Sequence, residues 1–501
     1  MFIGDIAEHM KMKCFIVLCA LLMVLAGSCK SELPGFQPAN ILFTPAITMP
    51  VAAPTFTTPV PPPTLTSSTT TQEQTITSTP SPTASNTNTP FTWHAGDKDV
   101  NGNLMYGTEI MRILSYNGKL YATTSMWMES DPSIPKACQL LVLDSPDGRW
   151  KILHQFTTRN LRLVSLETVT FGTDAVGKKI MPVTMLLVAP DTIGAGDAQV
   201  FSLDDNSGKL VPMSLGVSKS TYTSTRAIGS HHDAVTGIDL VFAGNDILGM
   251  FSGTYDPSSP GRVKWQTSPE LDIPVGERVM GFANSNGILY CSTSRHIYKR
   301  IDGPKPTWRE VYFCPQETNA TGIRGLTAVP NPSGKGEVLL FGALSAIRHI
   351  DPVDNYKETV ELDMKEYLGK LWNRTVPFVL SAYNDFLPYT DPRTGEKVYL
   401  FGFESEYKES EVQNNPQWRV YKTPAGAFAA EGRYFIRHAT EKGVSFDVEE
   451  ITDPTLSPLV SIRTIAMSPF ATDEGQVLYF GGFDCNSQPS HNTGWIYRGP
   501  Y

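Results

Sequence analysis

The chain has 501 residues, of which 41% are hydrophobic and 18% are charged, so it holds enough apolar material to build a packed core. Its formal net charge is -9. A protein that binds nucleic acid without sequence preference needs positive charge to neutralise phosphates, and we therefore expect no nucleic-acid partner.

The N-terminal residues have the pattern of a targeting segment. Lys11 and Lys13 precede an apolar run over 14–26, which is too short for an ordinary membrane span and typical of a signal peptide. Residues 25–29, Leu-Ala-Gly-Ser-Cys, resemble the lipobox of bacterial lipoproteins. The resemblance implies a signal peptide over 1–28, cleavage before Cys29 and a diacylglyceryl group on its sulfur. We then expect a cell-envelope protein that is anchored to the membrane outside the cytoplasm; the alternative is plain secretion.

Thr, Ser and Pro dominate the segment that follows, as in PVPPPTLTSSTTTQEQ. Such a composition cannot bury enough apolar area to offset the entropy that ordering would cost. We expect 29–91 to be a disordered, low-complexity stalk that holds the rest of the chain away from the membrane.

From residue 92 onward, a set of four strand-like segments recurs. The first segment usually begins with arginine, the second is apolar and aromatic, the third often ends in aspartate, and the fourth often starts with tryptophan. Short apolar runs between Asn- and Gly-rich turns are typical of β-strands, and an aspartate side chain can initiate a turn. The seven first segments start at Arg112, Arg162, Arg226, Arg278, Arg324, Phe378 and Arg463.

These repeats over 92–501 resemble a β-propeller, an all-β fold in which four-stranded sheets surround a central channel. The resemblance implies seven four-stranded blades, with six and eight as the alternatives. The last repeat has only three strands, so we expect a strand within 92–104 to complete it and close the ring. We also expect one helix, over 364–373, and an insertion over 404–430.

The propeller resemblance also implies a shared rim. The first strand of each blade would line the channel, and the ends of the second strands would lie on the same face as the arginines. This face would collect Asp246, Glu404 and Asp484, and a loop in the last repeat would add His491. The candidate ligand-binding residues are Arg112, Arg162, Arg226, Arg278, Arg324 and Arg463.

Two interpretations of the arginines remain open. In one, each arginine bonds to a carboxylate or carbonyl group of a neighbouring blade; repetition favours this interpretation, because a catalytic group is needed only once. In the other, several arginines face the channel and bind an anion, since uncompensated guanidinium groups that share a channel would repel one another. Their bidentate geometry suits carboxylate, sulfate or phosphate.

For function, we expect the arginine-bearing mouth to bind a small anionic or polar ligand, or a protein surface. The alternative is a hydrolase or lyase that acts in the channel, with or without a metal ion. The catalytic candidates, which would supply acid, base or metal ligands, are His491, Asp484, Asp246 and Glu404. No cofactor is indicated by a motif.

Two smaller groups of residues each have two possible interpretations. His231, His232 and Asp233 are residue types that bind metals, but the repeat places them at the turn between two strands, which favours a turn over a metal site. Cys291 and Cys314 fall within one repeat, and they either form a disulfide or are buried free thiols.

Overall fold

The computed structural model describes residues 91–126, 137–194, 196–219, 222–318, 321–380, 386–407, 421–423, 426–428, 432–440, 443–451, 461–473, 476–483 and 493–500. All of them belong to one compact unit, Ala84–Tyr501. The predicted signal peptide, Cys29 and the stalk up to residue 90 lie outside the described residues. Within the described part, no helix is long and apolar enough to span a membrane.

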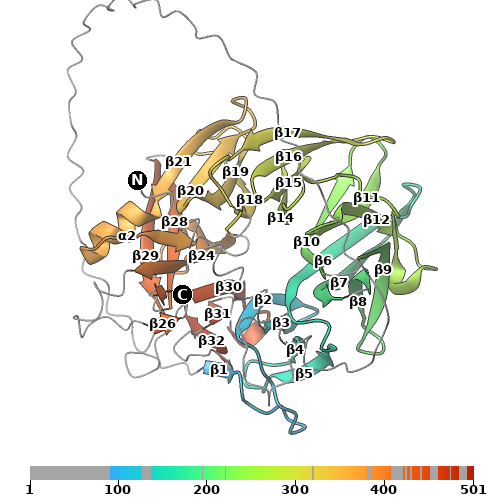
Figure 1. Cartoon of the computed structure of the whole chain (residues 1–501), viewed down its shortest axis with the longest axis horizontal. Coiled ribbons are helices and arrows are strands. Elements are labelled where there is room, and N and C mark those ends of the chain that lie inside the picture. The colour runs from blue at the N-terminus through green and yellow to red at the C-terminus, as the bar shows by residue number, and fades with distance from the viewer. Residues whose placement is uncertain are drawn as a thin grey trace, which may run out of the picture. The chain divides into compact units, whose positions relative to one another are not determined.

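The first three blades follow one another along the chain (Figure 1). Blade 1 consists of β2 (Glu109–Tyr116), β3 (Lys119–Ser125), β4 (Gln139–Leu143) and β5 (Lys151–Gln155). Blade 2 consists of β6 (Leu163–Thr173), β7 (Lys179–Ile193), β8 (Gly196–Asp204) and β9 (Lys209–Lys219). Blade 3 consists of β10 (Tyr222–Asp233), β11 (Ile238–Asn245), β12 (Gly249–Tyr255) and β13 (Val263–Trp265), with a short 3-10 helix, η1 (Pro260–Arg262), before β13. The start of β10 also pairs with the end of β7, so blades 2 and 3 share one continuous sheet.

Blades 4 and 5 are regular antiparallel sheets. Blade 4 consists of β14 (Val279–Ser285), β15 (Ile288–Thr293), β16 (His296–Ile301) and β17 (Thr307–Phe313). Blade 5 consists of β18 (Arg324–Pro330), β19 (Glu337–Ala343), β20 (Ala346–Asp351) and β21 (Lys357–Asp363). The helix α2 (Met364–Trp372) follows, with Asp363 capping its start and Asn373 in the left-handed region at its end. This helix confirms the one predicted over 364–373.

Blade 6 is the irregular one. Its main sheet consists of β23 (Leu387–Thr390), β24 (Lys397–Gly402), β28 (Arg433–Thr440) and β29 (Gly443–Glu450). A second small sheet contains β22 (Phe378–Leu380), β25 (Glu404–Tyr407), β27 (Gly426–Phe428) and β26 (Tyr421–Thr423). The described part of the predicted insertion, 404–430, therefore forms a strand extension and a short hairpin.

Blade 7 contains both ends of the domain. It consists of β30 (Ser461–Met467), β31 (Val477–Phe483), β32 (Gly494–Pro500) and the N-terminal β1 (Phe91–His94), with a short 3-10 helix, η2 (Ala471–Asp473), after β30. β1 pairs antiparallel with β32, and Nε1 of Trp150 in blade 1 donates to Oγ1 of Thr92 at 3.1 Å. The predicted closing strand is thus confirmed.

The innermost strands form a closed ring. β2 contacts β6, β6 contacts β10, β10 contacts β14, β14 contacts β18, and β30 contacts both β24 and β2. Blades 5 and 6 are joined where Oγ1 of Thr327 accepts from the backbone N–H of Phe386 at 3.2 Å. The described residues therefore form a seven-bladed, all-β propeller, as the repeat predicted.

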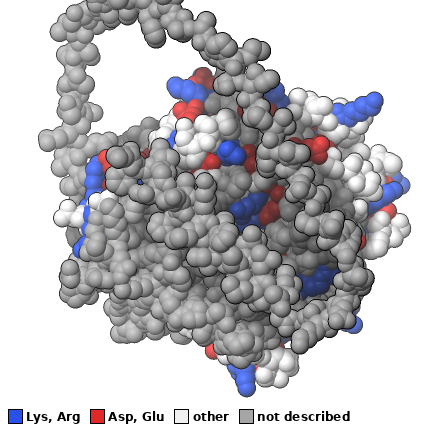
Figure 2. Space-filling model, in the orientation of Figure 1, with Lys and Arg blue, Asp and Glu red and all other residues white. Residues whose placement is uncertain are grey.

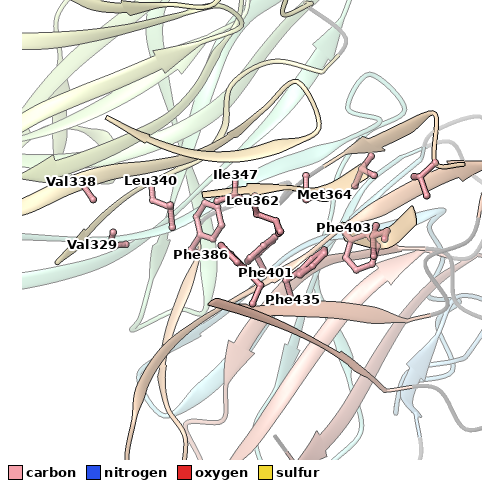
Figure 3. Packing of buried hydrophobic residues seen from close by; sticks show 14 residues of the cluster. Val329, Val338, Leu340, Ile347, Leu362, Met364, Phe386, Phe401, Phe403 and Phe435 are labelled. Atoms are coloured by element: carbon pink, nitrogen blue, oxygen red, sulfur yellow. The ribbon is translucent and has the colours of Figure 1, made fainter. Parts of the chain in front are cut away.

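Apolar side chains fill the spaces between blades, because each sheet buries both faces against its neighbours. Figure 3 shows one such layer between blades 5 and 6, where Leu340 and Ile347 pack toward Phe401 and Phe435. The rings of Phe401 and Phe435 stack with centroids 5.2 Å apart. These layers hold the innermost strands at fixed positions around the channel.

Candidate functional site

A β-bulge occurs beside every one of the six arginines predicted to start a first strand. The strand register shifts between residues 110 and 112, 163 and 165, 225 and 227, 279 and 281, 324 and 327, and 462 and 464. A bulge bends the strand and changes the direction of its side chains. The same backbone irregularity thus recurs at the same end of six innermost strands.

A buried carboxylate connects two of these arginines across the junction of the first and last blades. Glu109 has no exposed surface. Its Oε2 lies 3.2 Å from Nη2 of Arg162 in blade 2, and its Oε1 lies 3.3 Å from Nη2 of Arg463 in blade 7. The same Nη2 of Arg463 lies 3.0 Å from Oε2 of Glu404 in blade 6. Charged groups from four blades therefore meet at this end of the channel.

The charges of a second group of arginines act on Asp246. Nε of Arg226 donates to Oδ2 of Asp246 at 3.1 Å, and both side chains are buried. Burial raises the pKa of Asp246, while the positive charges of Arg226, Arg278 and Arg162 act to lower it. Arginines of three successive blades thus act on one carboxyl group. In Figure 2, basic and acidic residues lie side by side near the middle of the viewed face.

Burial also perturbs two other carboxyl groups at this end. It raises the pKa of Glu404 against the charges of Arg463 and Arg324. It raises the pKa of Asp191 to about 6, although a backbone N–H and the charge of Arg162 lower it. Perturbed carboxyl groups are common at functional sites, although structural ion pairs produce them too.

The predicted residues therefore divide into three sets. Arg226 pairs with Asp246 and Arg463 pairs with Glu404, while the charges of Arg162 and Arg278 act to lower the pKa of Asp246 and that of Arg324 acts to lower the pKa of Glu404. Arg112 lines a cavity together with Arg463. Asp484 and His491 lie outside the described residues.

That cavity occupies the channel between blades 1, 2, 6 and 7, and its volume is about 330 Å³. Its walls come from β2, β6, β23, β24 and β30, four of which are first strands of their blades. This volume is at the lower end of the range of small-molecule sites. The arginine-bearing end of the channel thus opens into a space that could hold a small ligand.

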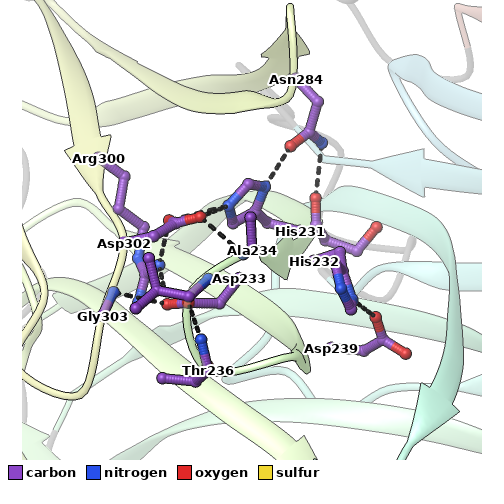
Figure 4. Close-up of polar contacts among 12 residues, drawn as sticks. His231, His232, Asp233, Ala234, Thr236, Asp239, Asn284, Arg300, Asp302 and Gly303 are labelled. Carbon is purple, nitrogen blue, oxygen red and sulfur yellow. Dashed lines mark hydrogen bonds and ion pairs between the residues drawn. The ribbon is translucent and has the colours of Figure 1, made fainter.

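His231, His232 and Asp233 lie at the other end of β10, and they point to different partners (Figure 4). Nε2 of His231 lies 3.0 Å from Asp302, and Nδ1 of His232 lies 2.7 Å from Asp239. Oδ1 of Asp233 accepts from the backbone N–H of Thr236 at 2.8 Å, within the turn to β11. Nowhere in the described ranges do three or more His, Cys, Asp or Glu side chains form a group that could hold a metal ion.

The neighbouring Arg300 explains the role of this cluster. Its guanidinium contacts Asp233 at 2.7 Å, Glu270 at 2.8 Å and Asp302 at 2.6 Å. Asp233 belongs to blade 3 and Asp302 follows β16 of blade 4, so the cluster joins two blades. Cys291 and Cys314 are free and buried, so the alternative of a disulfide between them is excluded.

Two central residues were not predicted from the sequence. One is Glu109, three positions before Arg112. The other is Asp191, whose Oδ1 accepts a hydrogen bond from the backbone N–H of Arg162 at 2.8 Å. A sequence signal exists for Glu109, because a glutamate at the start of an apolar strand needs a buried partner. Asp191 lies near the end of β7, the second strand of blade 2, at the position that Asp246 holds after β11, so the pattern of carboxyl groups at the ends of second strands was a signal for it.

The fold and the charged end of the channel together define the class of protein. It is a seven-bladed β-propeller with arginines around one mouth of its channel. No protein-family model and no curated protein matches the chain. Among solved structures, it is similar to the α-L-arabinofuranosidase of Fusarium graminearum in complex with an iminosugar inhibitor, at 11% identity and a TM-score of 0.39, over 82% of this chain and 98% of that one. It is also similar to a variant of the NanB sialidase of Streptococcus pneumoniae, at 10% identity and a TM-score of 0.37, over 82% of this chain and 70% of that one. Likenesses at this level concern the fold alone.

Proposed function

We propose that the protein binds a small anionic ligand at the arginine-bearing mouth of its channel. The observation that carries this proposal is the buried pair of Arg226 and Asp246, on which the positive charges of Arg278 and Arg162, from the two neighbouring blades, also act. An anion that enters this poorly hydrated end of the channel would be attracted by all three guanidinium groups.

The charges of the described groups support the same conclusion. Six arginines lie at or near the starts of the innermost strands, and four carboxyl groups interact with them: Glu109, Asp191, Asp246 and Glu404. A carboxylate, sulfate or phosphate ligand matches the bidentate geometry of a guanidinium group.

The six arginines have different roles in this proposal. Arg162 and Arg463 make ion pairs that join blades, so they belong to the framework of the ring. Arg112 and Arg278 are half-buried, and a ligand in the channel can reach them more easily. We therefore propose that the first interpretation of the repeated arginines applies to Arg162 and Arg463 and the second to Arg112 and Arg278.

The test is a thermal-shift series with sulfate, phosphate and acetate at constant ionic strength. Saturating anion should raise the unfolding midpoint, by about 2.7 kcal/mol of stability when the anion is at a hundred times its Kd. Arg278→Ala should abolish the shift, whereas Arg309→Ala, on the outer strand β17, should retain it. A wild-type midpoint that no anion moves would contradict the proposal.

We also propose that a lipid on Cys29 anchors the protein to the membrane outside the cytoplasm. The proposal is supported by the lipobox-like residues 25–29 and the Thr-, Ser- and Pro-rich segment behind them. Cys29→Ser should move the protein from the membrane to the soluble fraction after cell lysis. Equal membrane association of both forms would argue against the anchor.

A second candidate function is a hydrolase that acts in the channel. It is favoured by Asp246, a buried carboxyl group that its surroundings bias toward the protonated form and that could act as a general acid. Nitrophenyl esters, phosphates and glycosides are suitable probes. Turnover that Asp246→Asn abolishes while sulfate binding persists would favour the enzyme; absence of turnover across the panel leaves the binding function as the better account.

A further inference from the structure

Two carboxyl groups lie on either side of the start of β10, at the arginine-bearing end of the channel. Ser224 of β10 is the register partner of Asp191 in β7, and its carbonyl oxygen accepts from the backbone N–H of Asp246 at 2.8 Å. Both aspartates are buried. Burial raises the pKa of Asp191 and that of Asp246, so the neutral form of each carboxyl group is favoured.

The two oxygens of Asp246 have different surroundings. Oδ2 accepts from Nε of Arg226 at 3.1 Å, whereas Oδ1 is buried and has no hydrogen-bond partner among the described residues. A buried carboxylate oxygen without a partner is costly while it carries charge. Burial and the unpartnered oxygen thus favour the neutral form of Asp246, and the guanidinium of Arg226 favours the ionised form.

This balance makes the anion site depend on a proton. Arg226 is already paired with Asp246, so an anion that approaches Arg226 meets a carboxylate of its own sign. Like charges in a poorly hydrated place repel strongly, and the repulsion is relieved when the carboxylate takes up a proton. Protonation of Asp246 also leaves the positive charge of Arg226 to the anion.

The other charged and titratable groups around Asp246 belong to blades 2, 3 and 4. The charges of Arg278 and Arg162 act on Asp246 as well, and these arginines stay protonated throughout the neutral pH range. Burial and the charges of Asp191 and Asp246 raise the pKa of Tyr222, so its phenol stays neutral. Asp191, when ionised, adds to the repulsion that an anion meets.

We propose that the anion binds together with a proton, which Asp246 takes up from the solvent when the anion arrives. This inference rests on the proposed anion site and adds the regulation of that site. Acidic conditions favour binding, and alkaline conditions release the ligand, because the carboxylate of Asp246 then returns to Arg226.

The test is calorimetric titration of sulfate into the whole chain carrying Cys29→Ser, which keeps lipid and detergent out of the solution. Sulfate keeps the same charge across the neutral pH range, so it adds no pH dependence of its own. Titrations at one pH and ionic strength, in two buffers that differ in their enthalpy of ionisation, count the protons that the buffer supplies. We expect proton uptake on binding, and an affinity that falls by up to about tenfold for each unit of increase in pH.

A matched pair of variants assigns the proton to one carboxyl group. Asp191→Asn removes the neighbouring carboxyl group, and proton uptake should remain because Asp246 is still present. The double variant Asp191→Asn, Asp246→Asn should bind sulfate without proton uptake and with an affinity that no longer falls as the pH rises. Uptake that persists in the double variant, or that is already lost in Asp191→Asn, would show that Asp246 does not carry the proton.

The outcomes separate this inference from the anion site on which it rests. Sulfate binding without proton uptake, and with equal affinity at acidic and alkaline pH, would overturn the coupling and leave the anion site standing. Absence of sulfate binding at every pH would overturn both. The comparison of buffers needs no substitution near Asp246, so a variant that fails to fold does not remove the test.

Discussion

The guanidinium of Arg463 lies 3.3 Å from the carboxylate of Glu109, although the two residues are 354 positions apart in the chain. One belongs to the last blade and the other to the first. Because Glu109 also contacts Arg162, this carboxylate links blades 7, 1 and 2. The contact that closes the ring is thus part of the same charged rim that we propose binds the ligand.

Glu109→Gln should destabilise the protein by about 3–5 kcal/mol, because it removes the buried negative charge that the buried Arg463 and the half-buried Arg162 share. Urea denaturation measures the change. Asp144→Asn is the control, since Asp144 is half-exposed in its ion pair with Lys119 and should lose less than about 1 kcal/mol. Equal losses in the two variants would show that Glu109 does not hold the ring together.

Removal of the closing strand should open the propeller. Trp93 of β1 is 1% exposed, and β1 covers the edge of β32. A chain that begins at residue 96 should therefore lose at least about 3–5 kcal/mol, the usual loss when one buried tryptophan is deleted. A chain that begins at residue 91 keeps β1 and should unfold at the same urea concentration as the whole chain. If both shortened chains are equally stable, closure by β1 is unimportant.

Arg437 should be essential to the junction of blades 5 and 6. Its side chain has no exposed surface, and its Nε lies 2.6 Å from Oε2 of the equally buried Glu361. Arg437→Met should lose about 3–5 kcal/mol because Glu361 stays buried without its guanidinium partner. The double variant Arg437→Met, Glu361→Met should be more stable than the single one.

Lys370→Met is the control for this junction, because Lys370 and Glu366 are both exposed in their ion pair and this variant should lose less than about 1 kcal/mol. A double variant less stable than Arg437→Met alone would show that the buried charge of Glu361 is not the cause of the loss.

The stability of the protein should depend on pH through Asp191. Burial raises its pKa from 3.8 to about 6 in the folded state, so folding favours the neutral form. The contribution of neutral Asp191 to the stability of the folded state is fully present below the pKa of the unfolded chain, and it is lost as the pH rises through about 6. The asparagine side chain of Asp191→Asn cannot ionise, so this variant should not lose that contribution as the pH rises.

The free energy of unfolding of the wild type should therefore fall relative to Asp191→Asn by up to about 3 kcal/mol between about pH 4 and pH 7. Urea denaturation of both proteins at several pH values measures the difference. A difference that stays constant over this range would mean that Asp191 titrates alike in the folded and unfolded states.

Much of the fold could be predicted from the amino-acid sequence. Each strand segment is a local pattern of apolar residues between turns, and the pattern recurs with arginine near the start of six first strands. The three-stranded last repeat required a partner, and this predicted β1 before any contact was known. These features are local, because a strand and its hairpin neighbours are set by residues close in sequence.

What only the tertiary structure decided is which charges meet. The repeat could place the arginines at one end of the blades, yet it could not show that Glu109 pairs with both Arg162 and Arg463, or that Asp246 pairs with Arg226. Those contacts depend on how the blades are packed side by side and on the closure of the ring. A change of a few ångströms in that packing would separate the groups and leave the sequence pattern unaltered, because the energy of an ion pair depends on distance and burial, which a linear pattern does not contain.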